Sequence, residues 1–393
     1  MTEIVIDRVR RVMEVASVSQ TAFAEAIGVT PDKLSKSLGG IRRFTSLDLA
    51  RIAEFGSTTV DWLLTGREPL RPSFAARTSS GAVGGQARDE LKGLVERFTA
   101  AHEVLSLLGR SPGLPDLPAV RTELPRFVDQ GVALADDAAA RLAAAGSPPV
   151  CDMETAELLP AFEAAFGVDV AKVDLSQGID GAAWQAEGFR LIMIGRTKVP
   201  TRQRFTLAHE LGHILAADAQ DLVAETHLSP GHQKDMTEIR ANVFAANLLM
   251  ARGEITAAVR DRGLTDEELR SLVVRFKVSP SALAARLSQL GFIDSGASAK
   301  LRGISTETCH LLTGQSDRYA AEVAWSQAMR LPFRPAELLY EGYLAGETTL
   351  RPLAAYTGWD TDKLRAELEP EREPGPGPAL VVETEEGDLV FQP

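Results

Sequence analysis

The stretch Arg204-Phe-Thr-Leu-Ala-His-Glu-Leu-Gly-His213 contains the pattern His-Glu-x-x-His inside a run with helical periodicity. His209 and His213 are four residues apart, so their imidazoles leave the same face of a helix and can hold one Zn²⁺ ion. Glu210 lies beside that face, where its carboxylate can take a proton from a water molecule that the metal activates. Apolar residues around these three side chains would exclude bulk water and anchor the helix: Phe205, Leu207, Leu211, Ile214 and Leu215.

A catalytic zinc site needs a third protein ligand. Glu238 begins a second run with helical periodicity, whose apolar face would pack on the first helix and direct this carboxylate to the metal. Glu225 and Asp235 are rival ligands, disfavoured because both lie outside the helix expected from about 237 to 250. Asn242, one turn after Glu238, could support a ligand by a hydrogen bond. The apolar face consists of Ala241, Phe244, Ala245, Leu248 and Leu249.

Two more histidines, His227 and His232, lie in the loop expected between the two ligand helices. Either could stabilise the transition state by donating a hydrogen bond to the developing oxyanion. The competing interpretation is that both are solvated loop residues. For the pattern as a whole, the competing interpretations are an ordinary amphipathic helix with two surface histidines, or a zinc site without hydrolysis. Glu210 argues against the last of these, because a structural site gains nothing from a base.

The runs 204–213 and 241–250 resemble the ImmA/IrrE family of bacterial and phage metallopeptidases, and the resemblance covers roughly residues 150–293. It implies a gluzincin-like zinc peptidase, with Zn²⁺ as cofactor and Glu238 as third ligand. It also implies a protein substrate, usually a repressor of the helix-turn-helix class. The sequence departs from the family at Arg240, where many members have an acid, and at Ala251, where Pro is common.

Residues 1–70 read as a set of short helices. Ser19 and Thr30 are expected to cap two of them, with Gly28 in the turn between and Pro31 at the first position of the second helix. Residues 6–66 resemble the Xre (Cro/C1-like) helix-turn-helix family, which binds double-stranded DNA. The resemblance implies that the helix capped by Thr30 enters the major groove and presents its outward side chains to DNA. The candidate contacts are Lys33, Ser35, Lys36, Ser37, Arg42 and Arg43.

The remaining segments have weaker signals. Residues 71–150 are interpreted as a linker (71–86, rich in Gly and Ser) followed by a helical spacer or dimerisation element. Strands are expected at 168–175, 182–186 and 189–194, the last as an edge open to an extended peptide. Residues 266–293 form a helix-turn-helix-like subdomain, interpreted as packing on the peptidase (151–293) in preference to binding DNA. Residues 294–393 are expected to be a helical accessory region with a short C-terminal hairpin.

The fold class is therefore mainly α with a small β-sheet (α+β), preceded by an all-α DNA-binding domain. The net charge of −12 argues against nucleic acid as a partner of the whole chain, yet residues 1–77 have eleven basic and nine acidic residues. Two cysteines and no apolar run long enough for a signal peptide or a membrane span predict a cytoplasmic protein without membrane contact.

These features predict a DNA-binding transcriptional regulator with a zinc-dependent endopeptidase domain that cleaves a bacterial, repressor-like protein. Because both activities would lie on one chain, self-cleavage and cleavage of a DNA-localised partner are both open. A homodimer is expected, since single helix-turn-helix modules pair on palindromic sites. The alternative is a transcription factor whose metallopeptidase-like domain binds zinc and senses a ligand or partner without hydrolysis.

Overall fold

The computed structural model shows helices together with one small sheet, in agreement with the α+β class. The chain divides into two compact units, one containing the N-terminal helices and the other containing most of the sheet and the remaining helices. The structure describes residues 2–16, 18–56, 58, 60–66, 75–78, 85–176, 179–186, 188–218, 230–260 and 264–368.

The N-terminal unit has the short helices that the sequence predicts. Ser19 and Thr30 cap α2 and α3 by accepting hydrogen bonds from backbone N–H groups, and Gly28 in the turn between them has a φ of 65°. Phe23 and Phe55 meet edge to face at 5.1 Å inside the core of this unit. The helices are α1 (Thr2–Val15), α2 (Gln20–Ala26), α3 (Pro31–Leu38), α4 (Ser46–Phe55) and α5 (Val60–Thr65).

The sheet has the strand order β1-β3-β4-β2, in which β2 runs parallel to β4 and β1 runs antiparallel to β3. Two expectations are wrong here. The strand over 189–195 is central and not an edge, and part of the expected linker, residues 75–78, is a strand. Unpaired backbone groups on an edge recruit a partner strand, and a short Ala-rich segment can supply one. The strands are β1 (Ala75–Thr78), β2 (Asp169–Val173), β3 (Ile179–Ala186) and β4 (Phe189–Gly195).

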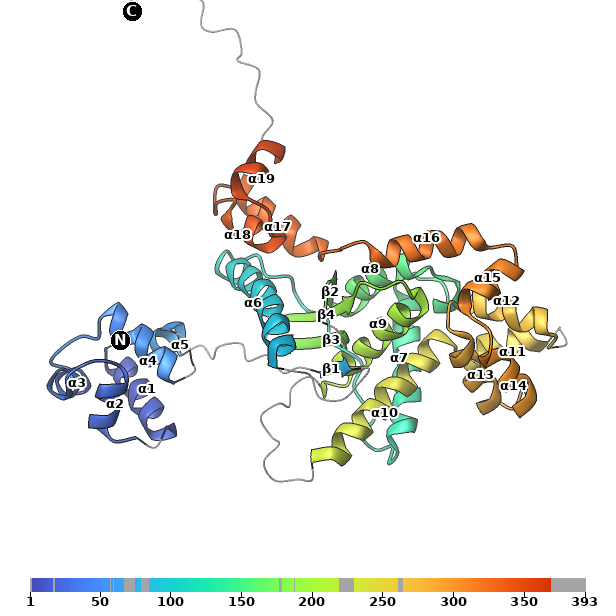
Figure 1. Ribbon diagram of the computed structural model, residues 1–393. Coiled ribbons are helices and arrows are strands. Elements are labelled where there is room, and N and C mark those ends of the chain that lie inside the picture. The colour runs from blue at the N-terminus through green and yellow to red at the C-terminus, as the bar shows by residue number, and fades with distance from the viewer. Residues whose placement is uncertain are drawn as a thin grey trace, which may run out of the picture. The chain divides into compact units, whose positions relative to one another are not determined.

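Helices α6 (Gly85–Leu107) and α7 (Phe127–Ala144), for which a spacer or dimerisation element is expected, pack against other elements of the second unit. His102 of α6 stacks on Phe189 of β4 at 4.0 Å, and Figure 1 shows α6 and α9 on opposite sides of the sheet. Leu134 and Leu142 of α7 are buried in the same hydrophobic core as α8 (Thr155–Phe166). Both helices therefore bury their apolar stripes within the chain itself.

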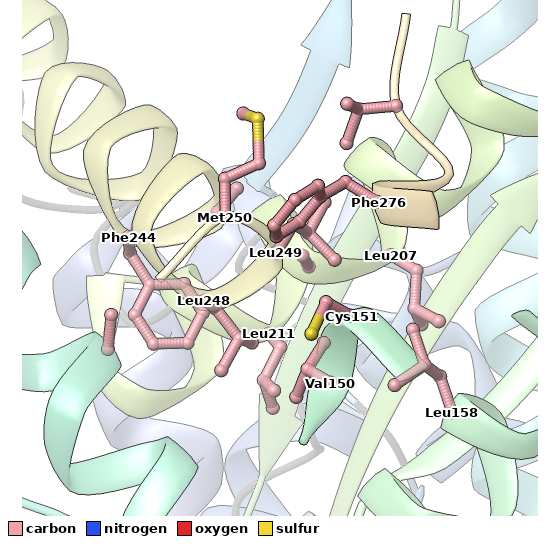
Figure 2. Close-up of a cluster of buried hydrophobic side chains, with 14 of the residues drawn as sticks. Val150, Cys151, Leu158, Leu207, Leu211, Phe244, Leu248, Leu249, Met250 and Phe276 are labelled. Carbon is pink, nitrogen blue, oxygen red and sulfur yellow. The ribbon is translucent and has the colours of Figure 1, made fainter. Parts of the chain in front are cut away.

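Helices α9 (Pro200–Leu215) and α10 (Pro230–Leu249) pack closely against each other. Leu211 of α9 and Phe244 of α10 lie in the buried cluster of Figure 2, together with residues of α8 and α12. Gly212 permits this approach, because a Cβ there would lie 2.9 Å from the Phe244 ring. α10 begins seven residues earlier than expected, since Pro230 suits the first position of a helix.

The segment after α10 also packs into this unit. Helices α12 (Asp266–Phe276) and α13 (Pro280–Gln289) flank the expected turn, where Lys277 adopts a φ of 54°. Lys277 and Arg286 are buried and donate hydrogen bonds to the Cys151 and Met250 carbonyls. These two cations therefore serve packing, as the favoured interpretation of this subdomain holds. α11 (Arg252–Arg260) lies between α10 and α12 in the sequence.

The C-terminal helices extend the same unit. α16 contacts α9, while α17 and α18 pack on α6. The expected C-terminal hairpin lies outside the described residues. Among the described helices, none combines the length and apolar character needed to cross a membrane. These helices are α14 (Ser295–Arg302), α15 (Thr306–Leu312), α16 (Ser316–Gln327), α17 (Phe333–Leu344), α18 (Arg351–Thr357) and α19 (Thr361–Leu368).

Candidate functional site

The structure brings three of the predicted metal ligands together. Nε2 of His209 lies 3.0 Å from Nε2 of His213. The two oxygens of Glu238 lie 3.3 Å from these nitrogens, Oε2 from His209 and Oε1 from His213. α9 supplies both histidines and α10 supplies the carboxylate, so the close packing of these two helices sets the geometry.

These distances fit a zinc ion. A tetrahedral Zn²⁺ with ligand bonds of about 2.0–2.1 Å holds its ligand atoms about 3.3 Å apart. Each nitrogen lies at about this distance from the other nitrogen and from one oxygen of Glu238, and two imidazoles with one carboxylate are a donor set that catalytic zinc accepts. The fourth corner of such a site is the position that catalysis requires.

The side of the centre nearest α9 is shielded from solvent, and the side nearest α10 is not. His209 and Glu210 are completely buried, whereas the side chain of Glu238 keeps 33% of its surface exposed. Glu210 lies beneath β3, because a Cβ at Gly181 would be 3.0 Å from its Oε1 atom. The candidate base is thus enclosed between a helix and a strand, next to a candidate metal centre that reaches solvent.

Asp218 is a site residue that the sequence did not reveal. Its Oδ2 atom lies 3.2 Å from Nδ1 of His213 and can accept the proton of that nitrogen, which leaves Nε2 for a metal. Ala217, in the left-handed conformation with a φ of 55°, turns the chain after α9. Arg240 donates to the other Asp218 oxygen, and its second amino group bonds Oε1 of Gln130 at 2.9 Å. The unusual Arg240 therefore supports the acid that orients His213.

The charges of the centre are coupled. Burial acts to lower the pKa of His213, but its hydrogen bonds to Asp218 and Glu238 and the charge of Glu210 together raise that pKa. Burial acts to raise the pKa of Glu238, whereas hydrogen bonds from His209 and His213 hold it well below the usual value. Glu238 consequently stays ionised at neutral pH and offers the anionic oxygen that a divalent cation needs.

A cavity of about 410 Å³ adjoins α9, the helix with the two candidate histidine ligands. Phe205, one turn before His209, lines it and has its ring centroid 6.4 Å from the His209 ring. Arg202 also lines it and pairs with Asp180 of β3, with 3.0 Å between Nε and Oδ2. The cavity therefore lies between α9 and α13, close to β3. Its other lining residues are Val199, Thr201, Val278, Ser279 and Ala282.

Several weaker candidates fall elsewhere. Glu225 and His227 lie outside the described residues. Asp235 and His232 lie within α10 and not in a loop, because that helix begins at Pro230; nothing is described of their side chains. Asn242 is exposed, and the support expected from it is provided by Asp218, which accepts a hydrogen bond from His213.

The candidate DNA contacts separate into two groups. Lys33, Ser35, Lys36 and Arg43 are exposed, as a DNA-facing role requires. Ser37 is fully buried, and its hydroxyl accepts a hydrogen bond from Arg42 at 3.0 Å, so its expected outward orientation is wrong. Arg42 also pairs with the buried Asp48 at 2.8 Å and thereby secures the start of α4.

The fold and the centre together have the character of a metallopeptidase domain. Residues 163–288 match the family model described as the IrrE N-terminal-like domain (Peptidase_M78). The radiation response metalloprotease IrrE of Deinococcus radiodurans is 34% identical over 101 residues, which cover 25% of this chain and 31% of that protein. Its counterpart in Deinococcus deserti is also 34% identical over 101 residues, 36% of its length. The chain thus spans about a third of the curated relatives it matches, and the matches support the ImmA/IrrE family and a metallopeptidase.

Proposed function

We propose that this chain is a zinc-dependent endopeptidase that cleaves a bacterial regulatory protein of the repressor type, and that its N-terminal helices bind DNA. The observation that carries the first part is the spacing of the His209, His213 and Glu238 ligand atoms, with Glu210 beside them. The relatives are named radiation response metalloproteases, which supports a protein substrate. The exposed cations of α3 support the second part.

The chemistry follows from the residues around the centre. His209, His213 and Glu238 would hold Zn²⁺, which when bound supplies the Lewis acidity that polarises a carbonyl group and activates water. Glu210 accepts a proton from the attacking water and then delivers it to the nitrogen of the leaving amine. Its burial beneath β3 keeps bulk water from competing for this proton. Asp218 holds His213 in the orientation that leaves Nε2 available.

The test compares newly formed protein N-termini in cells that produce the wild-type chain or Glu210→Gln. This substitution retains the shape of the side chain and all three ligands, so zinc content should stay unchanged. We expect N-termini that occur only with the wild type, and these identify the substrate, including the chain itself. Matching profiles under several stresses, with zinc present in both proteins, would show that the centre senses a ligand or partner without hydrolysis.

A further inference from the structure

The segment Ala75–Thr78 occupies the free side of β3. Its backbone pairs antiparallel with this strand, with Ala75 opposite Ala183 and Arg77 opposite Gly181. The sequence marks the same segment as part of a linker between the N-terminal helices and the rest of the chain. A linker would satisfy its backbone groups in water, so its pairing with the sheet has to be explained by what the edge of β3 offers.

This edge lies next to the candidate base. Gly181 of β3 approaches α9 so closely that a Cβ there would lie 2.5 Å from Cγ2 of Thr206 and 3.0 Å from Oε1 of Glu210. Arg77 is the direct partner of Gly181, and β1 contacts α9 as well as β3. In Figure 1, β1 is the last strand of the sheet and lies beside α9. The backbone of β1 therefore runs directly beside the strand residue that faces Glu210.

An endopeptidase has to receive its substrate as an extended chain. A peptide bond that is still packed within the folded structure of the substrate cannot reach the base. An extended peptide binds most simply by adding a strand to an open sheet edge. The other edge strand, β2, is separated from β3 by β4 in the sheet. Its outer side is already occupied in part, because the backbone of Lys172 pairs with the backbone of Arg330. The β3 edge is the one that leads a peptide to Glu210.

We propose that β1 is an internal competitor that occupies the peptide-binding edge of β3 and is displaced when a substrate binds. This inference rests on the proposed endopeptidase function. The strand is suited to displacement because it has only four residues and its register shifts between Arg77 and Thr78. A short, irregular pair of strands adds little stability, whereas a longer substrate strand can form a more regular ladder.

The test uses the full chain with Glu210→Gln, so that binding is measured without cleavage. The disrupting variant adds Ala76→Pro and Arg77→Pro. Neighbouring residues of a strand direct their N–H groups to opposite sides, so one of the two substitutions removes a donor to β3. The matched control adds Ser79→Pro and Ser80→Pro, which lie in the same linker but beyond β1. The probe is a fluorescent peptide with the sequence of residues 72–81.

We expect the disrupting variant to bind the probe at least about tenfold more tightly than the control, because an edge that is open more often binds with a proportionally higher apparent affinity. Without the probe, backbone amides of residues 179–183 should exchange with deuterium faster in the disrupting variant. Equal probe binding in both variants, or equal exchange of these amides, overturns the proposal. Equal zinc contents and melting temperatures establish that both proteins are folded.

Restoring Glu210 separates this proposal from the proposed function. If the chain is an endopeptidase, the disrupting variant should cleave its substrate faster than the control does. If neither protein cleaves anything, while probe binding and amide exchange differ as expected, the endopeptidase function fails and the competition at β3 stands. Cleavage of the wild-type chain within residues 75–78 overturns the proposal, because β1 would then be a substrate and not a competitor.

Discussion

At the scale of single residues, the centre depends on the acid behind His213. Asp218 accepts a hydrogen bond from Nδ1, and Arg240 holds the opposite oxygen of the same carboxylate. We expect Asp218→Asn to weaken zinc binding about 10- to 100-fold, because partners of this kind fix the tautomer and the basicity of a metal-binding imidazole. Titration against a chelator of known affinity measures the effect. Asp317→Asn, at an exposed acid on α16, is the control, and equal affinities would show that His213 needs no support.

The four residues of the candidate centre could be predicted from sequence, since helical spacing places His209 and His213 on one face and a second apolar run places Glu238. Asp218 could not be predicted. It lies beyond the end of α9, where helical periodicity no longer applies, and it reaches His213 only because Ala217 adopts a left-handed conformation. An alanine gives no sequence signal for that conformation, which glycine and asparagine adopt far more often. Arg240 differs from the acid common at this position in the ImmA/IrrE family, and only the structure shows that it donates a hydrogen bond to Asp218.

At the scale of elements, the contact between β3 and α9 positions the base. A methyl group added at Gly181 would lie 2.5 Å from Thr206 and 3.0 Å from Glu210, so Gly181→Ala must move the strand or the carboxylate. A shift of about 1 Å at a catalytic group can reduce the rate about 100-fold. We expect such a loss in the cleavage rate of the substrate found by the comparison of N-termini, with the zinc content unchanged. Gly253→Ala, where a Cβ meets nothing within 4 Å, is the control; equal rates would refute this positioning.

Elements with a strong local pattern were predicted well, and elements that depend on distant partners were not. α2, α3, α9 and α13 have capping residues or Pro at their starts, and the expected helices agree with the observed ones within a few residues. β1 has no such signal, because four residues of the sequence Ala-Ala-Arg-Thr become a strand only when β3 supplies the hydrogen bonds. The role of α7 in the core was missed for the same reason, since its apolar stripe does not show which element it will meet.

At the scale of the whole molecule, charge is unevenly distributed along the chain. The net charge is −12, although residues 1–77 contain more basic than acidic residues, so the acidic excess lies beyond them. Repulsion between this excess and phosphate groups works against any DNA contact made by the N-terminal helices. Binding by the full chain should therefore be weak for a single copy and should fall steeply as salt rises.

This expectation can be tested with Lys33, which is exposed on α3. The full chain is incubated with a pool of random double-stranded DNA, and the bound sequences are recovered and used to measure affinity at several salt concentrations. We expect Lys33→Ala to weaken binding and to reduce the slope of log affinity against log salt by about one, the signature of one lost phosphate contact. Arg11→Ala, the loss of an exposed cation on α1, should leave both quantities close to the wild type. If no sequence is enriched even at low salt, the N-terminal helices serve protein contacts, and recruitment to DNA cannot select the substrate.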